Sequence, residues 1–413
     1  MRTNEPPKQE GSLSDGTIVR FEKCGLGSIN YDSYPPVKAK LAAYLPSSLQ
    51  NGLGERARMG SSDDPRSLCF VFSVWSPDGK RQKDFDEPFS RFEFVESTGF
   101  VFDVKNTGYG HTSNLIAFGL AAFPRRDREL HMRLFESETD RLLFELKIPN
   151  PGYQPTVSEW QPEELPVSRT SAPLTVTLSH VPVGVSLNDL SDDDIEITST
   201  DRRWTSTRLE RSLLLSDATG NQVDDYILPS LSPFEPVWKL SLRIWRGADA
   251  EFSDDERWTT KTYPLPSSSD IVPIGVKQTV SGVEIEALML CPAGVVSEDG
   301  PSFKVSPSTR TGQRGLSIDL GNRNASFATI DSGFPFIPVT ISAHDEDTEV
   351  LLTIRDQNGT KLSLNSGSSA DPNLRIVQFD PKPESTEVQL EVIVSRIRKF
   401  EFFVKPPRPT TTP

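Results

Sequence analysis

The sequence predicts an all-β protein of about three tandem β-sandwiches joined by proline-rich linkers. Short runs in which apolar and polar residues alternate recur along the whole chain, and this spacing is typical of strands with one buried face. The 34 prolines outnumber the 26 glycines, which favours loops and edge strands over long helices. With 413 residues, the chain is too long for a single sandwich core, so several domains are expected.

Proline-rich stretches divide the strand patterns into three blocks. The first block ends where an alternating run meets Pro149-Asn150-Pro151, and the strand pattern restarts at Leu174. The predicted organisation is a disordered arm at 1–15, a first sandwich at 16–150, a linker at 151–172, a second sandwich at 173–266, a third at 267–405 and a disordered tail at 406–413.

The first block contains the clearest strand signal. The apolar run at 68–75 precedes the turn Ser76-Pro77-Asp78-Gly79, so it is predicted to be a buried strand. Residues 37–45 favour a short helix, and residues 115–123 fit a strand or a helix equally well. The other strands of this block are expected at 17–21, 91–95, 100–104, 130–134 and 144–148.

The second and third blocks consist of strands separated by polar loops. The second block contains two acidic loops, at 192–194 and 254–256. Its strands are expected at 174–178, 195–198, 211–216 and 238–245. The third block is predicted to have strands at 283–290, 316–320, 325–330, 339–343, 349–355, 375–379, 388–394 and 400–404.

A set of landmarks recurs in the same order in each block. A strand ends in an acidic residue, and a glycine that suits a hairpin turn with positive φ follows three positions later. An alternating strand comes next, and a last strand then runs into prolines. The acid and glycine pairs are Glu96 and Gly99, Asp217 and Gly220, and Asp356 and Gly359. Three related sandwiches are therefore predicted, with three unrelated β-domains as the alternative.

Three short motifs carry a resemblance to a known class of proteins. They are Ala122-Phe123-Pro124-Arg125-Arg126, Ile148-Pro149-Asn150-Pro151 and Ser216-Asp217-Ala218-Thr219-Gly220-Asn221. With them the sequence resembles uncharacterised bacterial proteins built of tandem immunoglobulin-like β-domains. The resemblance implies immunoglobulin-like sandwiches. That class has no established activity, so no catalytic residues are implied.

Charge and hydropathy restrict the partners and the compartment. The formal net charge is −14, which repels nucleic acid and anionic membrane surfaces. No run approaches the roughly 20 apolar residues of a membrane span, and the first 14 residues lack the apolar core of a signal peptide. We expect a cytoplasmic protein without a membrane span. Removal of a leader would make cell-envelope association the alternative.

Residues suited to catalysis or metal binding are sparse. Cys24, Cys69 and Cys291 are too few and too widely spaced for a disulfide framework or a metal site, so buried thiols and no cofactor are expected. The sequence contains no nucleophile elbow, zinc motif or phosphate-binding glycine loop. The first acidic loop lacks the spacing and glycine of an EF-hand, so solvated acidic loops are expected, with a loose Ca²⁺ site between domains as the alternative. Consecutive strand residues point to opposite faces, so the run His344-Asp345-Glu346-Asp347 is also expected to be a solvated loop.

Two places are candidates for ligand contact. His111 and Tyr109 lie in a glycine-rich stretch, Gly108-Tyr109-Gly110-His111-Thr112, which as a loop could present an imidazole to a ligand. Trp245 shares a strand face with Arg243, opposite the core face that carries Trp238. Trp245 either stacks against a sugar ring or a protein partner, or packs against Trp258 or the linker near Trp160.

These observations favour a non-catalytic function. The main hypothesis is a scaffold or binding module for a protein partner that the sequence does not identify. The first alternative is a carbohydrate-binding or cell-envelope protein that uses Trp245. The second alternative is a hydrolase whose site is assembled from loops around His111.

Overall fold

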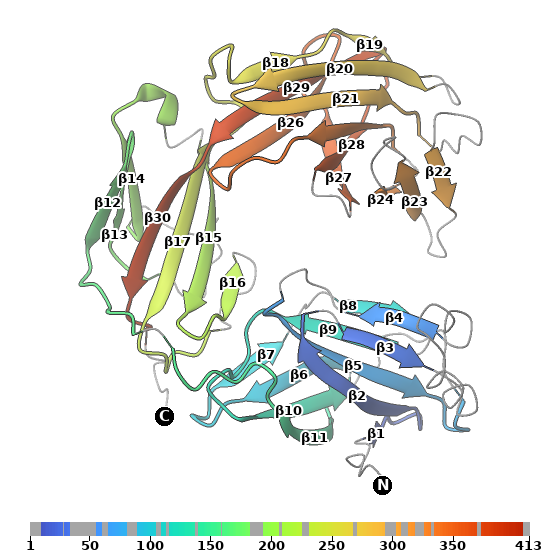
Figure 1. The fold of residues 1–413 in the computed structure, drawn as a ribbon, viewed down its shortest axis with the longest axis vertical. Coiled ribbons are helices and arrows are strands. Elements are labelled where there is room, and N and C mark those ends of the chain that lie inside the picture. Colours follow the sequence, from blue (N-terminus) through green and yellow to red (C-terminus); the bar gives the residue numbers. More distant parts are fainter. Residues whose placement is uncertain are drawn as a thin grey trace.

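The structure, a computed structural model, consists almost wholly of antiparallel β-sheets that are arranged along an arc (Figure 1). No α-helix occurs in the described part of the chain, and its one helical element is the 3-10 turn η3 (Arg202–Trp204). The all-β prediction is therefore confirmed. The structure describes residues 10–27, 29–33, 55–59, 65–80, 89–104, 109–112, 115–136, 139–157, 159–181, 193–205, 209–224, 231–266, 271–293, 303–306, 313–318, 326–331, 334–369 and 373–407.

The N-terminal sheet pair comprises a five-stranded and a four-stranded sheet. The first sheet has the order β1 (Glu10–Ser12), β2 (Ile18–Leu26), β5 (Leu68–Trp75), β9 (Leu115–Leu120), β8 (Tyr109–Thr112). The second has the order β11 (Leu142–Pro149), β10 (Glu129–Glu136), β6 (Phe89–Val95), β7 (Val101–Val104). A separate two-stranded sheet joins β3 (Ile29–Ser33) and β4 (Glu55–Met59).

Aromatic side chains fill the space between these two sheets. Phe70 on β5 meets Phe92 on β6 with ring centroids 4.9 Å apart, and Phe118 on β9 lies 4.9 Å from Phe92. Such edge-to-face pairs contribute about 0.5–1.5 kcal/mol each beyond the burial of their area. The core position of these rings follows from the period-2 alternation of each strand.

The middle sheet pair contains a three-stranded and a four-stranded sheet. The three-stranded sheet has the order β12 (Val167–Ser171), β13 (Leu174–Leu178), β14 (Ile195–Ser199). The four-stranded sheet has the order β16 (Gln222–Asp224), β15 (Leu209–Asp217), β17 (Trp238–Arg246), β30 (Arg398–Val404). Trp238 is 5 % exposed and lies in the core, as the alternation of its strand predicts.

The C-terminal sheet pair is the largest. Its eight-stranded sheet has the order β20 (Val272–Val280), β21 (Val283–Leu290), β25 (Phe336–Ile341), β28 (Leu374–Asp380), β27 (Ser363–Ser369), β24 (Ser326–Asp331), β23 (Gln313–Ile318), β22 (Phe303–Ser306). In the facing sheet, β29 (Glu387–Arg396) pairs with β26 (Thr348–Asp356), β18 (Arg257–Thr259) and β19 (Tyr263–Pro264).

The predicted landmarks occupy equivalent registers in three sheets. In each sheet, the residue two positions before the landmark acid pairs with a residue of the alternating strand that follows. The three pairs are Phe94 with Met132, Leu215 with Leu240 and Ile354 with Leu390. Each glycine N–H donates to the carbonyl of its acid, at 2.8, 3.1 and 2.9 Å. The φ angles of Gly99, Gly220 and Gly359 are 88°, 92° and 79°, a region that favours glycine. One hairpin design therefore occurs three times.

The last strands of the middle and C-terminal sheet pairs are exchanged. In the N-terminal pair, Leu130 pairs with Ile148 of the strand that follows it. In the middle pair, however, Trp238 pairs with Val404 at the far end of the chain. The two strands that follow β17 in sequence, β18 and β19, lie in the C-terminal pair instead, where Tyr263 of β19 pairs with Val388.

Three further segments differ from the sequence-based organisation. Residues 10–12, expected in a disordered arm, form β1, and residues 167–171 of the expected linker form β12. Residues 398–404, grouped by sequence with the third block, pair with β17 because the chain returns to the middle sheet after β29.

Residues 115–120 form a strand, whereas the helix expected at 37–45 lies outside the described residues.

Candidate functional site at the junction of the N-terminal and middle sheet pairs

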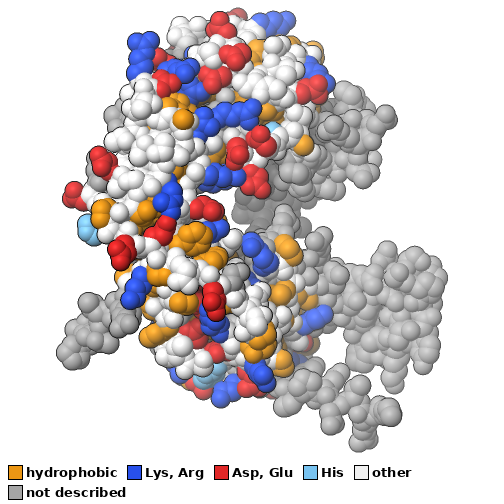
Figure 2. Space-filling model, turned by 60° about the vertical axis from the view of Figure 1, so that its left-hand side comes forward, with side chains coloured by type: hydrophobic (Ala, Val, Ile, Leu, Met, Phe, Trp, Pro, Cys, Tyr) orange, Lys and Arg blue, Asp and Glu red, His pale blue; other side chains and the backbone are white. Residues whose placement is uncertain are grey.

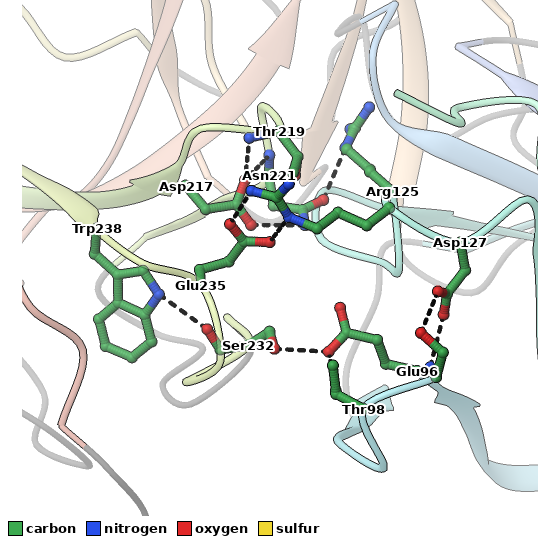
Figure 3. A network of polar contacts seen from close by, with 12 residues as sticks. Glu96, Thr98, Arg125, Asp127, Asp217, Thr219, Asn221, Ser232, Glu235 and Trp238 are labelled. Carbon is green, nitrogen blue, oxygen red and sulfur yellow. Dashed lines mark hydrogen bonds and ion pairs between the residues drawn. The ribbon is translucent and has the colours of Figure 1, made fainter. Parts of the chain in front are cut away.

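A buried polar network joins the loop between β9 and β10 to the turn between β15 and β16 (Figure 3). Asn221 lies at its centre and is 2 % exposed. Its Oδ1 accepts hydrogen bonds from the backbone N–H of Phe123 at 3.1 Å and from Nε of Arg125 at 2.8 Å. Its Nδ2 donates to the carbonyl of Phe123 at 3.0 Å and to Oδ2 of Asp217 at 2.9 Å. One amide thus uses both ends to hold two sheet pairs together.

Arg125 is buried with its charge in the same network. Its guanidinium lies over the ring of Phe123, 4.2 Å from the centroid, and its Nη2 donates to the carbonyl of Arg66 at 2.6 Å. A buried guanidinium is tolerated only when its donors are used and a π face or a carboxylate offsets its charge. Removal of Asn221 or of Phe123 would therefore leave an expensive buried cation.

Asp217 terminates β15 and is 2 % exposed. Its Oδ1 accepts from the N–H and hydroxyl of Thr219 at 2.9 and 2.5 Å and from the N–H of Asn221 at 3.1 Å. Burial raises the pKa of this carboxyl, and nearby Glu235 adds to the rise, although the hydrogen bonds from Thr219 and Asn221 act in the opposite direction.

Glu235 and Arg126 form an ion pair across the junction. Nε and Nη2 of Arg126 donate to Oε1 and Oε2 of Glu235 at 2.5 and 2.7 Å, so the pair is bidentate. This hydrogen bonding to Glu235 raises the pKa of Arg126, against the effect of partial burial. Because Glu235 is 5 % exposed, loss of Arg126 would leave a buried carboxylate without its main partner.

A second bridge lies beside this ion pair. Oε2 of Glu96, the acid of the first hairpin, accepts from the hydroxyls of Ser232 at 2.7 Å and Thr98 at 2.5 Å. The carbonyl of Ser232 accepts from the indole N–H of Trp238 at 3.1 Å. Two of the three landmark acids therefore lie at this junction, and both accept hydrogen bonds there.

The beginning of the linker is fixed to the same loop. Nδ2 of Asn150 donates to the carbonyls of Pro124 and Asp127, each at 2.7 Å, and its Oδ1 accepts from the N–H of Gly152 at 2.9 Å. A Cβ on Gly152 would lie 2.5 Å from the ring of Phe123, so only glycine fits here. The three motifs that carried the family resemblance thus converge in space, although up to about a hundred residues separate them in sequence.

The end of the linker docks on β30. The N–H of Glu163 donates to the carbonyl of Phe403 at 2.7 Å, and the N–H of Phe403 donates to Oε2 of Glu163 at 3.0 Å. Trp160 packs against the ring of Phe403 with centroids 5.4 Å apart. The proline-rich linker is therefore held at both ends by specific contacts.

The residues of this junction hold one another through hydrogen bonds and a bidentate ion pair. Among its described residues the network includes no histidine and no cysteine, and its carboxylates accept hydrogen bonds from donors of the protein. No group of three or more potential metal ligands occurs within the described ranges. The network therefore fixes the orientation of two sheet pairs.

The predicted residues Trp245 and Arg243 lie on the outer face of β17. The indole N–H of Trp245 donates to Oε2 of Glu210 on the neighbouring strand at 3.2 Å, and the indole is half-buried. Nη2 of Arg243 donates to the carbonyl of Glu346 in the C-terminal sheet pair at 3.1 Å. The two suggested packing partners lie elsewhere, since Trp160 contacts Phe403 and Trp258 packs against the C-terminal core.

Tyr109 and His111 lie in strand β8 rather than in a loop. They pair with Phe118 and Ile116 of β9, and β8 forms the edge of its sheet. Their side chains lie outside the described part of the structure, so the suggested ligand contact of His111 stays a prediction.

The remaining candidate groups have structural partners. Nδ1 of His344 lies 3.0 Å from the carbonyl of Ser342, and Nδ1 of His180 lies 3.2 Å from that of Asp193. In the second acidic loop, Glu256 binds Arg246 and Ser253. The three cysteines are free thiols, and burial raises the pKa of Cys24 and of Cys291 to about 12.

Sequence reasoning missed Arg125, Asn221 and Glu235. Charged and amide residues in loops are normally solvated, and no periodicity marks the exceptions. The family resemblance was the one signal that included Arg125 and Asn221.

Comparison with known proteins assigns no family to the chain. No family model matches the sequence, and neither a curated protein nor a solved structure matches it. Among the residues that the structure describes, no helix has the length and apolar character needed to cross a bilayer.

Proposed function

We propose that this chain is a non-catalytic scaffold that presents sheet faces and edges of three linked β-sandwiches to a protein partner. The observation that carries this proposal is the buried junction around Asn221. A buried amide, a buried guanidinium and a bidentate ion pair are costly to assemble. They hold the first two sheet pairs in one orientation, as a scaffold with fixed spacing between its surfaces requires.

The charge of the surface favours a protein partner over a polyanion such as nucleic acid. The net charge is −14, and the face in Figure 2 carries acidic and basic side chains side by side rather than a basic field. Function in such a protein lies in loops and strand edges that a rigid framework positions.

We further propose that the three sheet pairs are repeats of one plan. The shared hairpins and registers support this proposal. The two-sheet architecture is compatible with the resemblance to immunoglobulin-like domains, but the strand order differs. In immunoglobulin constant domains the third strand lies in the sheet opposite the first two strands, whereas here β5, β14 and β25 pair with β2, β13 and β21, in each case within one sheet.

Distance measurements between spin labels test the scaffold proposal. Labels are placed through Lys147→Cys, Arg202→Cys and Lys277→Cys, one exposed position in each sheet pair. The native thiols have raised pKa values and stay largely unlabelled. The expected result is a narrow distance distribution for each pair of labels. A broad distribution between 147 and 202 in the unmodified background would show jointed domains and refute the proposal.

Asn221→Ala should broaden the distribution between 147 and 202, because it removes the oxygen that accepts from Nε of Arg125 and from the Phe123 N–H. Asn358→Ala provides the matched control, since Asn358 is exposed in the equivalent hairpin of the C-terminal pair. It should leave this distribution unchanged.

A carbohydrate-binding function is the second candidate, and Trp245 supports it. The half-buried indole is oriented by Glu210 and lies on the outer face of a sheet. Retention on insoluble polysaccharide that is lost in Trp245→Ala, at an unchanged melting temperature, would favour this function over a protein scaffold.

A further inference from the structure

Among the described residues, the middle sheet pair lacks a strand that the other two sheet pairs have. In the N-terminal pair the third strand, β5, lies between β2 and β9, and in the C-terminal pair β25 lies between β21 and β28. The corresponding strand of the middle pair, β14, pairs with β13 on one side. Among the described residues nothing pairs with its other side. β14 is thus an edge strand, whereas the corresponding strands of the other two sheet pairs, β5 and β25, are internal.

The burial of the three strands reflects this difference. Residues 68–74 of β5 are all buried, and five of the six residues of β25 are buried. In β14 only Ile195 is buried, Ile197 is half-buried, and Glu196, Thr198 and Ser199 are exposed. The three-stranded sheet lies on the convex side of the arc (Figure 1), where a partner can approach it.

The backbone of β14 is oriented for pairing on its open side. The carbonyl of Asp194 accepts from Ser179 at 2.9 Å, and the N–H of Thr200 donates to Pro173 at 3.1 Å, so the even-numbered positions face β13. In an antiparallel ladder the alternate residues direct their N–H and C=O groups the other way. Ile195, Ile197 and Ser199 therefore present their backbone groups to the open edge.

The charge of this segment indicates which partner fits. Residues 192–201 include Asp192, Asp193, Asp194, Glu196 and Asp201 and contain no lysine or arginine. Asp201 pairs with Arg203, but Glu196 in the middle of the strand is exposed. Natural edge strands are often protected by lysine, proline or a bulge, and β14 has none of these.

We propose that the open edge of β14 binds a basic, extended segment of a partner protein as an added antiparallel strand. The segment takes the place that β9 and β28 take in the other two sheet pairs, and both of these pair antiparallel with their neighbours. Main-chain hydrogen bonds supply affinity, and lysine or arginine side chains beside Glu196 supply selectivity. This inference rests on the proposed scaffold function and specifies the partner of one edge.

The probe is a fluorescent peptide of about eight residues in which lysine and valine alternate, long enough for a short strand. A peptide in which glutamate replaces lysine is the charge control. Fluorescence anisotropy with the full chain should show binding of the basic peptide and none of the acidic one. Hydrogen exchange should slow at the amides of Ile195, Ile197 and Ser199, which point to the open edge.

Two variants and one control locate the site. Ile197→Pro removes an outward N–H without touching the ladder to β13, and it should weaken peptide binding at least tenfold. Glu196→Lys, on the exposed face, should weaken it about two- to fivefold, as expected for one exposed charge. Glu164→Lys makes the same charge change in the linker and should have no effect. Ile197→Pro also removes the packing of a half-buried side chain and can unfold the protein. In that case, hydrogen exchange in the unmodified chain and peptide binding by Glu196→Lys still test the proposal.

Equal binding of both peptides, or protection of amides away from β14, would overturn the proposal. A dimer of the free chain that protects the β14 amides without peptide would also overturn it, in favour of a second copy at this edge. The spin-label distances separate these outcomes from failure of the scaffold proposal, because they report the geometry of the sheet pairs and do not depend on the peptide.

Discussion

The two junctions of this protein hold their sheet pairs together by different means. Between the N-terminal and middle pairs the chain crosses once, and buried side chains fix the orientation. Between the middle and C-terminal pairs the chain crosses twice, because β17 leads into β18 and β29 leads back into β30. Ile397 alone separates β29 from β30, and it is 3 % exposed. The first junction depends on side-chain chemistry and the second on chain topology.

Side chains also contribute to the second junction, with a different composition. The guanidinium of Arg246 lies 4.3 Å from the ring centroid of Phe252 and 5.4 Å from that of Trp204. It donates to the carbonyl of Glu251 at 2.7 Å and to the carboxylate of Glu256. Arg246 and Arg125 are equally buried, at 3 % exposure each. They therefore provide a matched pair with which to compare the two junctions.

Deletion of residues 398–413 should have the largest effect. It removes Phe400, Phe402 and Val404, which are buried at 2 % exposure or less, and it leaves β17 paired with β15 alone. Full burial of each such side chain contributes about 1.5–3 kcal/mol, so the sum approaches the whole stability of a domain. The middle sheet pair should fail to fold. In a denaturant titration, its cooperative unfolding transition should disappear.

Deletion of residues 408–413 alone is the control for this truncation, and it should leave the transition unchanged. If the chain without β30 unfolded with the same midpoint as the full chain, the exchange of strands would be refuted.

Substitution of the two buried arginines should separate the junctions. Arg125→Ala and Arg246→Ala each remove a buried guanidinium and leave its acceptors unpaired, at a cost of about 3 kcal/mol in unfolding free energy. Arg125→Ala should also broaden the spin-label distance between 147 and 202 and speed proteolysis in the linker. Arg246→Ala should leave the distance between 202 and 277 narrow, because two chain crossings persist.

The opposite result would reverse the comparison between junctions. Broadening of the distance between 202 and 277 in Arg246→Ala would mean that side chains, rather than the double crossing, hold the second junction.

Two buried carboxylates should give smaller effects with opposite pH dependence. Glu136, at the end of β10, accepts from the N–H and hydroxyl of Ser14 at 2.5 and 2.6 Å, and these bonds with others lower its pKa from 4.5 to about 2. A lowered folded pKa contributes stability that is present above about pH 4.5 and is lost as the pH falls toward 2. The advantage of the unmodified chain over Glu136→Gln in unfolding free energy should therefore shrink across this window.

Asp217 at the junction should behave in the reverse way. Burial raises its pKa above the ordinary 3.8, so its contribution to stability is present below that pH and is lost as the pH rises through the folded value. The stability of Asp217→Asn relative to the unmodified chain should rise as the pH increases from about 4. Denaturant titrations of the two variants and the unmodified chain at several pH values measure how each stability difference changes with pH. If both differences changed in the same direction, the opposite pKa shifts of Glu136 and Asp217 would be contradicted.

The sequence by itself determined many of the strands, the three landmark hairpins and the inward faces of those strands. Alternation specifies which side chains of a strand share a face, as in Phe92 and Phe94 or Leu240 and Leu242, and this property is local. The acid and glycine of each hairpin were predictable because a residue with positive φ and a capped turn involve only neighbouring positions. The apolar run at 68–75 became β5 for the same reason.

Tertiary structure alone decided which strands pair over long distances and which polar residues are buried. Val404 and Tyr263 both precede prolines in alternating runs, and nothing local indicates that they exchange partners. The alternating run at 195–199 is compatible equally with an internal and an edge strand, because edge status depends on a neighbour. Asn221 and Arg125 read as solvated loop residues, and only the approach of two distant loops gives each the partner that makes burial possible.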